Sequence, residues 1–437
     1  MTFSLIIAKI IAFILRIFNR GATTLPGRVA LWLKYNILTK LSRGVRIICV
    51  TGTNGKTTTC ALLEHALRKG GCSCFINKSG ANMLSGVTTS FIMNSTVFGR
   101  CKKEFAILEC DENSLPEISR YIDAEILVVT NIFRDQLDRF GEIDYTLAQI
   151  KKGIENMPKA TLVLNADDPL SYTLSYCKNK AVSFGINEEL GGESVSDNRF
   201  CPMCSAELSY KYKTLGQLGG FYCPRCSYRR KTPDISLSGI SGTGFMLNYG
   251  GEARLAFTSL KGAYNLYNYC AAAAALLTLG KGDINALSSF SGAFGRMEKF
   301  EYGGRTVLLL LVKNPVGLTG CIRYVSTLEE STDTAFALND NAADSKDVSW
   351  IWDSDFTPLA ENKGRVITLG LRSWDMALRL KYDGITPDLI IEGENYSRLI
   401  NEIKNGDRDF IVFANYTSMM NMRRYFIEAF GGREFWE

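Results

Sequence analysis

The stretch that most constrains the fold is Arg46-Ile-Ile-Cys-Val-Thr-Gly-Thr-Asn-Gly-Lys-Thr-Thr-Thr59. Residues 46–50 predict a buried strand, and Gly52-Thr53-Asn54-Gly55 predicts a turn. From Lys56 to Lys69 apolar residues recur at helical spacing, and Gly70-Gly71 ends that helix. In a strand, glycine turn and helix of this kind, backbone N–H groups face an anion and the helix N-terminus adds partial positive charge. The stretch therefore predicts a phosphate-binding loop.

The motif is the short form Gly-x-x-Gly-Lys-Thr, because the first glycine of the longer form would stand at position 50, which is valine. Lys56 is expected to be exposed and to reach the terminal phosphates of the ligand, while Thr57 is expected to hold Mg2+. The alternative is a chance glycine turn, which the flanking strand and helix argue against. The residues expected to bind the nucleotide are Gly52, Thr53, Asn54, Gly55, Lys56, Thr57 and Thr58.

Size and composition limit the number of domains and the classes of protein to which this chain can belong. The 437 residues predict two or three domains of about 100–200 residues each. A net charge of +5 is small for this length. It does not indicate a nucleic-acid-binding protein, which would need a concentrated basic stripe. Thirteen cysteines, without a secretory cleavage pattern, predict a reduced, cytoplasmic location. The single histidine, His65, lies in the predicted helix, so a triad that needs histidine is not expected to be complete in this chain.

Short apolar runs alternate with helical stretches, which predicts an α/β fold with helices on both faces of a parallel sheet. Ligands of such sheets bind beyond the carboxyl ends of the strands. The acidic stretch 108–112 and the polar stretch 130–138 follow two predicted strands, and a carboxylate there is a candidate second Mg2+ ligand. Solvated acidic loops are the alternative. The predicted strands are 72–76, 105–108, 126–130, 161–164 and 181–184, and, beyond Phe300, 305–312, 334–338, 365–369, 388–391 and 409–413.

Four cysteines have the spacing of a metal site: Cys201-Pro-Met-Cys204, eighteen residues, then Cys223-Pro-Arg-Cys226. Two pairs of thiolates on tight turns supply the tetrahedral sulfur ligands that Zn2+ prefers, and four sulfurs leave no open position for catalysis. We expect a structural zinc ribbon inserted at about residues 198–231. Zinc ribbons often bind nucleic acid, but a small module with solvated basic side chains is the simpler interpretation.

Residues 3–18 are very apolar, and Lys9 and Arg16 lie seven residues apart on one helical face. The run is shorter than the roughly 20 apolar residues that a transmembrane helix needs. Two interpretations remain open, a helix packed on the body of the protein and a helix lying on a membrane surface.

Several motifs, in the same order along the chain, resemble the Mur ligase family. Besides the glycine turn, Thr130-Asn-Ile-x-x-Asp-x-Leu-Asp138 is similar to a family motif that has His where this chain has Gln136. Gly262-Ala-Tyr-Asn-Leu-Tyr-Asn268 is similar to the family's Gly-x-x-Asn-x-x-Asn. Gly295-Arg296-Met-Glu298 is similar to its Gly-Arg-x-Glu. The resemblance covers residues 52–298 and extends into an α/β domain beyond them.

The resemblance implies an enzyme that uses ATP to convert a carboxylate into an acyl phosphate, which an amine then attacks. It implies Mg2+ bound by Glu109, an Asn268 contact with the adenine side of ATP, and Arg296 in the nucleotide site. It also implies three segments: a lead-in at 1–45, a central ATP-binding domain at 46–298, and a C-terminal Rossmann-like α/β domain at 299–437.

Two features, the four-cysteine insertion and Asp347-Val-Ser-Trp-Ile-Trp-Asp353, resemble one branch of this family. The branch comprises synthetase subunits that work with a glutamine amidotransferase. It implies a GatD-like partner that releases ammonia from glutamine, and lipid II at the inner face of the membrane as the substrate. The α-carboxylate of D-glutamate in the lipid II stem peptide would be phosphorylated and then amidated to D-isoglutamine.

Aspartates follow the aromatic stretch Trp350-Ile-Trp352 directly. A glutaminase needs a Cys–His pair whose imidazole is oriented by a third group, and exposed aromatic residues are common interface anchors. We therefore expect Asp353, with Asp355 as the second choice, to complete the catalytic triad of the partner. The alternative is a strand edge with solvated acids.

Two other functions remain open. One is an amino-acid-adding Mur ligase or a folylpolyglutamate synthetase-like ligase, which gives no reason for the cysteine insertion or the Trp-Ile-Trp-Asp segment. The other is a nucleotide-sensing scaffold that binds nucleic acid through the ribbon, with a salt dependence that is easy to detect.

Overall fold

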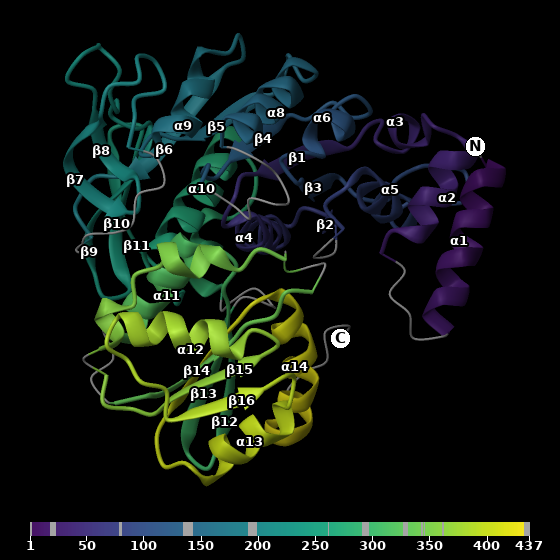
Figure 1. Ribbon diagram of the computed structural model, residues 1–437. Coiled ribbons are helices and arrows are strands. Elements are labelled where there is room, and N and C mark those ends of the chain that lie inside the picture. Colours follow the sequence, from purple (N-terminus) through teal and green to yellow (C-terminus); the bar gives the residue numbers. More distant parts are fainter. Residues whose placement is uncertain are drawn as a thin grey trace. The chain divides into compact units, whose positions relative to one another are not determined.

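The structure is a computed structural model that describes residues 2–17, 23–77, 81–133, 143–190, 199–260, 262–290, 297–326, 331–341, 344, 346–360 and 362–431. The described residues form two compact units, the first reaching residue 290 and the second starting at residue 297. Each unit is built on its own sheet (Figure 1).

The first unit contains a nine-stranded sheet in the order β11-β10-β9-β6-β5-β4-β1-β3-β2. Neighbours from β2 to β9 pair in parallel, which confirms the predicted parallel sheet, and β10 and β11 add an antiparallel edge. The strands are β1 (Arg46–Thr51), β2 (Cys74–Ile76), β3 (Phe105–Glu109), β4 (Ile126–Val129), β5 (Thr161–Asn165), β6 (Ala181–Ile186), β9 (Ile235–Ser241), β10 (Gly244–Tyr249) and β11 (Glu252–Phe257).

Helices cover both faces of this sheet (Figure 1). β3 and β4 are buried along their whole length, as expected for apolar strands covered on two sides. On one face α4 packs on β1 to β3, α10 packs on β4, β5, β6 and β9, and the two helices touch each other. The helices are α1 (Thr2–Ile17), α2 (Leu25–Leu33), α3 (Ile37–Leu41), α4 (Lys56–Lys69), α5 (Leu84–Met93), α6 (Leu115–Ile118), α8 (Ile143–Glu155), α9 (Pro169–Tyr172), α10 (Ala263–Leu279), and the 3-10 helices η1 (Thr173–Tyr176) and η2 (Ile284–Ser289).

The antiparallel strands β10 and β11 were not predicted from the sequence. Their turn, Gly250-Gly251, has positive φ at both residues, the backbone that a two-residue hairpin favours. β11 is exposed at most of its positions, so it carries no continuous apolar run to reveal it.

Helix α1 packs on the body of the unit through Leu5, Ala8 and Ala12, which are fully buried. The Lys9 ammonium donates to the carbonyls of Ile92 and Ser95 at 2.8 and 2.7 Å. The same helix leaves a row of large apolar side chains exposed: Phe3, Ile6, Ile10, Phe13 and Ile14. Within the described part of the chain, no helix has the length and apolar character needed to cross a membrane.

The four-cysteine insertion contributes a separate two-stranded sheet, β7 (Ser209–Leu215) and β8 (Leu218–Tyr222), which pair antiparallel. Two of its cysteines, Cys201 and Cys223, join a small core with Phe221 and Tyr228. Ala166 and Tyr172 of the main body belong to the same core, so the insertion is packed onto the unit rather than detached from it.

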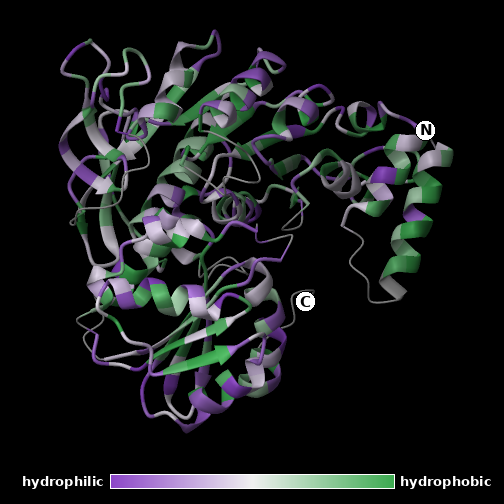
Figure 2. Ribbon diagram, in the orientation of Figure 1, coloured by the Kyte–Doolittle hydropathy of each residue, from purple (hydrophilic) through white to green (hydrophobic). Residues whose placement is uncertain are grey.

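The second unit contains a six-stranded sheet in the order β12-β13-β17-β14-β15-β16, parallel except for β12. Hydrophobic residues run along its strands (Figure 2), and one apolar core lies on each face. The strands are β12 (Met297–Tyr302), β13 (Arg305–Leu311), β14 (Asp333–Ala337), β15 (Val366–Gly370), β16 (Leu389–Glu392) and β17 (Phe410–Ala414). The helices are α11 (Pro315–Ser326), α12 (Ser373–Tyr382), α13 (Tyr396–Asn405), α14 (Tyr416–Phe430), and the 3-10 helices η3 (Ser349–Asp353) and η4 (Thr357–Leu359).

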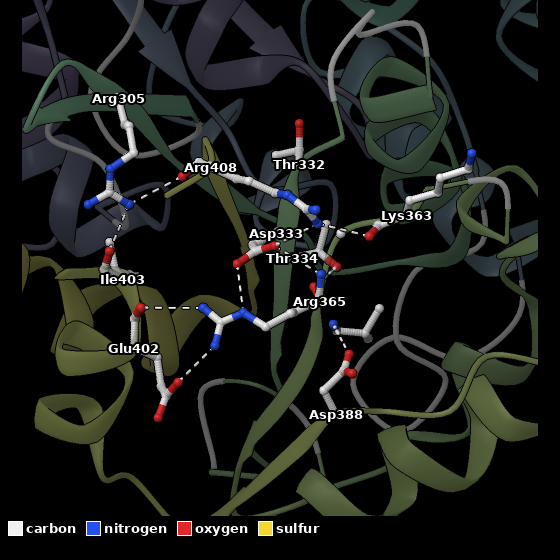
Figure 3. Close-up of polar contacts among 12 residues, drawn as sticks. Arg305, Thr332, Asp333, Thr334, Lys363, Arg365, Asp388, Glu402, Ile403 and Arg408 are labelled. Carbon is white, nitrogen blue, oxygen red and sulfur yellow. Dashed lines mark hydrogen bonds and ion pairs between the residues drawn. The ribbon is translucent and has the colours of Figure 1, made fainter. Parts of the chain in front are cut away.

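Charged residues close the amino ends of these strands (Figure 3). The Arg365 guanidinium pairs with Asp333 at 2.9 Å and with Glu402 at 3.0 Å. Arg305 donates to the carbonyl of Ile403 at 2.9 Å, in the last turn of α13. This network fixes the strand starts, so it belongs to the scaffold rather than to a ligand site.

Candidate functional site

The glycine loop, residues 52–55, connects β1 to α4 in the backbone that its glycines allow. Gly52 and Gly55 have φ values of +119° and +87°. A Cβ atom at Gly52 would clash with Thr130, and one at Gly55 would clash with Asn268. Glycine is therefore required at both positions, for its positive φ and for the close approach of neighbouring groups.

The end of β4 holds this loop in place. The Thr53 and Asn54 N–H groups donate to the Asn131 carbonyl and side-chain oxygens, both at 2.9 Å. The Thr130 hydroxyl donates to the Asn54 carbonyl at 2.7 Å, and the Thr53 hydroxyl donates to the Phe133 carbonyl at 3.0 Å. Two of the N–H groups expected to face an anion are thus engaged by Asn131 in this conformation.

Lys56 is buried, which corrects the expectation of an exposed loop lysine. Its ammonium donates to the Gly52 carbonyl and to the Glu112 carboxylate, both at 2.6 Å. Burial opposes the charged form, but Glu112, Asp111 and Glu109 outweigh it and raise the pKa of Lys56. The lysine is therefore a buried cation inside a group of carboxylates, close to the start of α4.

The carboxylates come from the end of β3, next to β1 in the sheet. Glu109 pairs with Val50 in the strand register and is buried. Asn77 holds its backbone, accepting from the Glu109 N–H at 2.7 Å and donating to the Glu109 carbonyl at 2.8 Å. The acidic stretch predicted at a strand end thus lies beside the glycine loop.

Asn268 lies in the first turns of α10, directly against Gly55. Its amide donates to the Asn265 side-chain oxygen at 3.1 Å, and both side chains are buried. Thr57 is half-buried in the first turn of α4 and Thr58 is buried. The structure therefore gathers the loop, Glu109 and Asn268 in one place, at the carboxyl ends of β1 and β3.

The four cysteines form one cluster in which all sulfur atoms lie within 4.8 Å of one another. The backbone N–H groups of Met203 and Arg225 donate to the sulfurs of Cys201 and Cys223, both at 3.4 Å. Burial raises the pKa of the Cys223 thiol, but N–H donors from Arg225 and Cys226 lower it to about 6. Four converging sulfurs with N–H donors are a donor set that fits a structural Zn2+ ion.

In the second unit, Asp353 ends η3 and is exposed, and Asp355 is half-buried two residues later. The Asp355 carboxylate accepts from the Thr357 N–H at 3.0 Å and lies 3.5 Å from the Arg323 guanidinium. The aromatic stretch is a 3-10 helix and not a strand edge. It buries Trp350 and leaves Trp352 exposed.

Some predicted residues lie outside the described ranges: Arg296, Gln136, Asp135 and Asp138. Other residues of the site had no role in the sequence-based prediction. Glu112 stood in the acidic stretch without an assigned partner, and Asn131 stood in a family motif without a role. Gln217, a buried amide of the cysteine insertion, had no sequence signal at all.

Two families match the chain: residues 50–216 match the Mur ligase middle domain, and residues 311–419 match the MurT ligase C-terminal domain. The chain is 35% identical to the MurT subunit of the glutamine-hydrolysing lipid II isoglutaminyl synthase of Streptococcus pneumoniae, over 97% of this chain and 96% of the relative. It is 33% identical to the MurT subunit of Staphylococcus aureus strain COL, over 98% of both chains.

Solved structures show the same fold at low sequence identity. A pseudomurein peptide ligase type C from Methanothermus fervidus matches with a TM-score of 0.69 and 21% identity, over 88% of this chain and 78% of the other. MurF from Acinetobacter baumannii matches with a TM-score of 0.66 and 16% identity, over 92% and 80%. These likenesses establish a Mur ligase-like α/β fold with parallel sheets.

Proposed function

Because the chain belongs to the MurT family of Mur-type ligases, we propose that it is the ATP-dependent subunit of a lipid II isoglutaminyl synthase. The proposed reaction converts the α-carboxylate of D-glutamate in the stem peptide into the amide of D-isoglutamine. The observation that carries the ATP-binding part is the glycine loop, with Lys56 buried among carboxylates at the carboxyl edge of a parallel sheet.

The chemistry proceeds in two balanced steps. A carboxylate oxygen of the substrate attacks the γ-phosphorus of ATP, and ADP leaves. Ammonia then attacks the carbonyl carbon of the acyl phosphate and loses a proton, and phosphate leaves with the former carboxylate oxygen. Lys56 and the N-terminus of α4 offset the negative charge of the phosphates.

Glu109 and Thr57 are the proposed ligands of Mg2+, because they supply oxygen donors beside the loop. Mg2+ would neutralise charge on the transferred phosphoryl group. Asn268 is proposed to contact the adenine side of ATP, and Arg296 to belong to the same site. Zn2+ is proposed for the cluster of Cys201, Cys204, Cys223 and Cys226, with a structural role.

The ammonia is proposed to come from a GatD-like glutamine amidotransferase that binds the C-terminal domain. Asp353, which is exposed at the end of η3, is proposed to orient the catalytic histidine of that partner. The test uses the complex with its partner. Asp353→Asn should stop synthesis from glutamine but retain synthesis from high ammonium, whereas the control Asp355→Asn should retain both. If Asp353→Asn retains synthesis from glutamine, the proposed role of Asp353 is wrong.

The decisive test of the whole proposal follows an oxygen atom. Substrate labelled with 18O in the α-carboxylate should give one labelled oxygen in the released phosphate, and only when ATP and ammonia are both supplied. Unlabelled phosphate would rule out the acyl phosphate. Transfer of an amino acid instead of ammonia would favour an amino-acid-adding ligase.

A further inference from the structure

The tip of the hairpin β7–β8 is buried in the first unit instead of projecting into solvent. Gln217, between the two strands, has no exposed surface. Its amide nitrogen donates to the Ile132 carbonyl at 2.8 Å and to the Asp168 carboxylate at 3.2 Å. The cysteine insertion therefore reaches the segment that follows β4.

Asp168 also holds the backbone of Ile132. Its carboxylate accepts from the Ile132 N–H at 2.7 Å and from the Leu170 N–H at 3.1 Å. The N–H and the carbonyl of Ile132 are therefore both bonded, one to Asp168 and the other to Gln217. Its neighbours, Asn131 and Phe133, are the residues that bond Thr53 and Asn54 of the glycine loop.

A second contact from the hairpin leads to α10, the helix whose Asn268 lies against Gly55 of the glycine loop. The Thr214 hydroxyl is hydrogen-bonded to the Tyr267 hydroxyl, which donates to the Asp167 carboxylate at 2.7 Å. Tyr267 precedes Asn268, the residue that lies against Gly55. Both buried contacts of the hairpin tip thus end one residue away from a group that touches the glycine loop.

We propose that Gln217 is a positioning residue of the nucleotide site: through Ile132 it fixes the segment that holds the glycine loop, and with it the start of α4, in place. This rests on the proposed function, in which that loop binds ATP. It also gives the cysteine insertion a role, because Zn2+ at the four cysteines would keep the hairpin folded while its tip supports the loop. A purely structural role would lower stability without a selective effect on ATP.

The test replaces Gln217 by Met in the full-length chain, which keeps the volume and removes both donated bonds. We expect the affinity for ATP to fall roughly tenfold or more, because a buried hydrogen bond contributes about that much. The KM for ammonium should not change. Calorimetric ATP titration and steady-state kinetics measure the two quantities. The matched control is Lys211→Ala, an exposed position on β7, which should bind ATP like the unaltered protein.

A second variant covers the case in which Gln217→Met does not fold. In Gln217→Glu the new carboxyl faces Asp168, and it can donate to the Ile132 carbonyl only when it carries a proton itself. The ATP affinity of this variant should therefore rise as the pH falls. The ATP affinity of the unaltered protein should not rise in the same way. Equal ATP affinity of a folded Gln217→Met and the unaltered protein would overturn the inference, as would a pH-independent Gln217→Glu. Failure of the unaltered protein to bind ATP would instead overturn the proposed function.

Discussion

At the scale of single residues, the buried ion pair of Lys56 and Glu112 lies in the proposed ATP site. The two side chains are 5% and 6% exposed and 2.6 Å apart, so removing Lys56 takes away the cation that offsets the buried Glu112 carboxylate. Lys56→Met should abolish ATP-dependent amidation and lower the free energy of unfolding by about 3 kcal/mol or more. The double variant Lys56→Met/Glu112→Gln should recover much of the stability but none of the activity. Denaturant unfolding measures the stability and product formation measures the activity. Amidation by either variant would show that Lys56 is not part of the ATP site.

Asp168 should make the stability of the first unit depend on pH. Burial raises its pKa to about 6, although N–H donors from Ile132 and Leu170 partly oppose this. Between about pH 4 and pH 6 the unfolded chain has released this proton while the folded chain still holds it. The free energy of unfolding should therefore fall as the pH rises through this window.

Asp168→Asn should remove this part of the slope, because an amide does not titrate. The neighbouring Asp167, whose pKa burial raises against the opposing effect of Arg230, stays in both proteins and contributes equally. Urea unfolding at several pH values measures the difference between the two slopes. Parallel slopes would mean that Asp168 titrates in the folded protein as it does in an unfolded chain.

At the scale of elements, the cysteine insertion should couple metal binding to the glycine loop. Elemental analysis should find close to one zinc per chain, and Cys204→Ser should lose it and destabilise the insertion, since metal binding and local folding are linked. If the hairpin supports the loop, ATP affinity should fall in the same variant. The matched control is Cys177→Ser, a half-buried cysteine outside the cluster. A zinc-free protein with full stability would contradict the metal assignment.

At the scale of the whole molecule, the first unit carries an exposed apolar helix face within a basic segment of the chain. Residues 1–50 contain eight Lys or Arg and no Asp or Glu. The ribbon of α1 is largely green, the colour of hydrophobic residues, in Figure 2, and the helix exposes a row of large apolar side chains. An exposed apolar face in a basic segment binds anionic lipid surfaces. We propose that α1 docks on the membrane that presents lipid II.

Phe13→Glu should therefore weaken sedimentation with anionic phospholipid vesicles and raise the KM for lipid II several-fold, without changing the KM for ATP. Phe13 and Leu255 are both 65% exposed, so Leu255→Glu on β11 is the matched control and should leave vesicle binding unchanged. Equal binding of the two variants, or binding to neutral vesicles alone, would contradict the proposal.

The sequence by itself determined the features that depend on local order. Glycines at 52 and 55, followed by a helical repeat, specify the loop because positive φ and helical spacing are properties of a few consecutive residues. The cysteine spacing and the alternation of apolar runs predicted the cluster and the parallel sheets for the same reason.

Only the tertiary structure decided what surrounds Lys56 and what supports the loop. Glu112 lies 56 positions from Lys56, and Gln217 lies 85 positions from Ile132. Such pairs meet because of strand order: β3 and β4 flank β1, and an insertion between β6 and β9 folds back toward the end of β4. No local pattern records that order, so a lysine that the motif placed in solvent is buried as half of an ion pair.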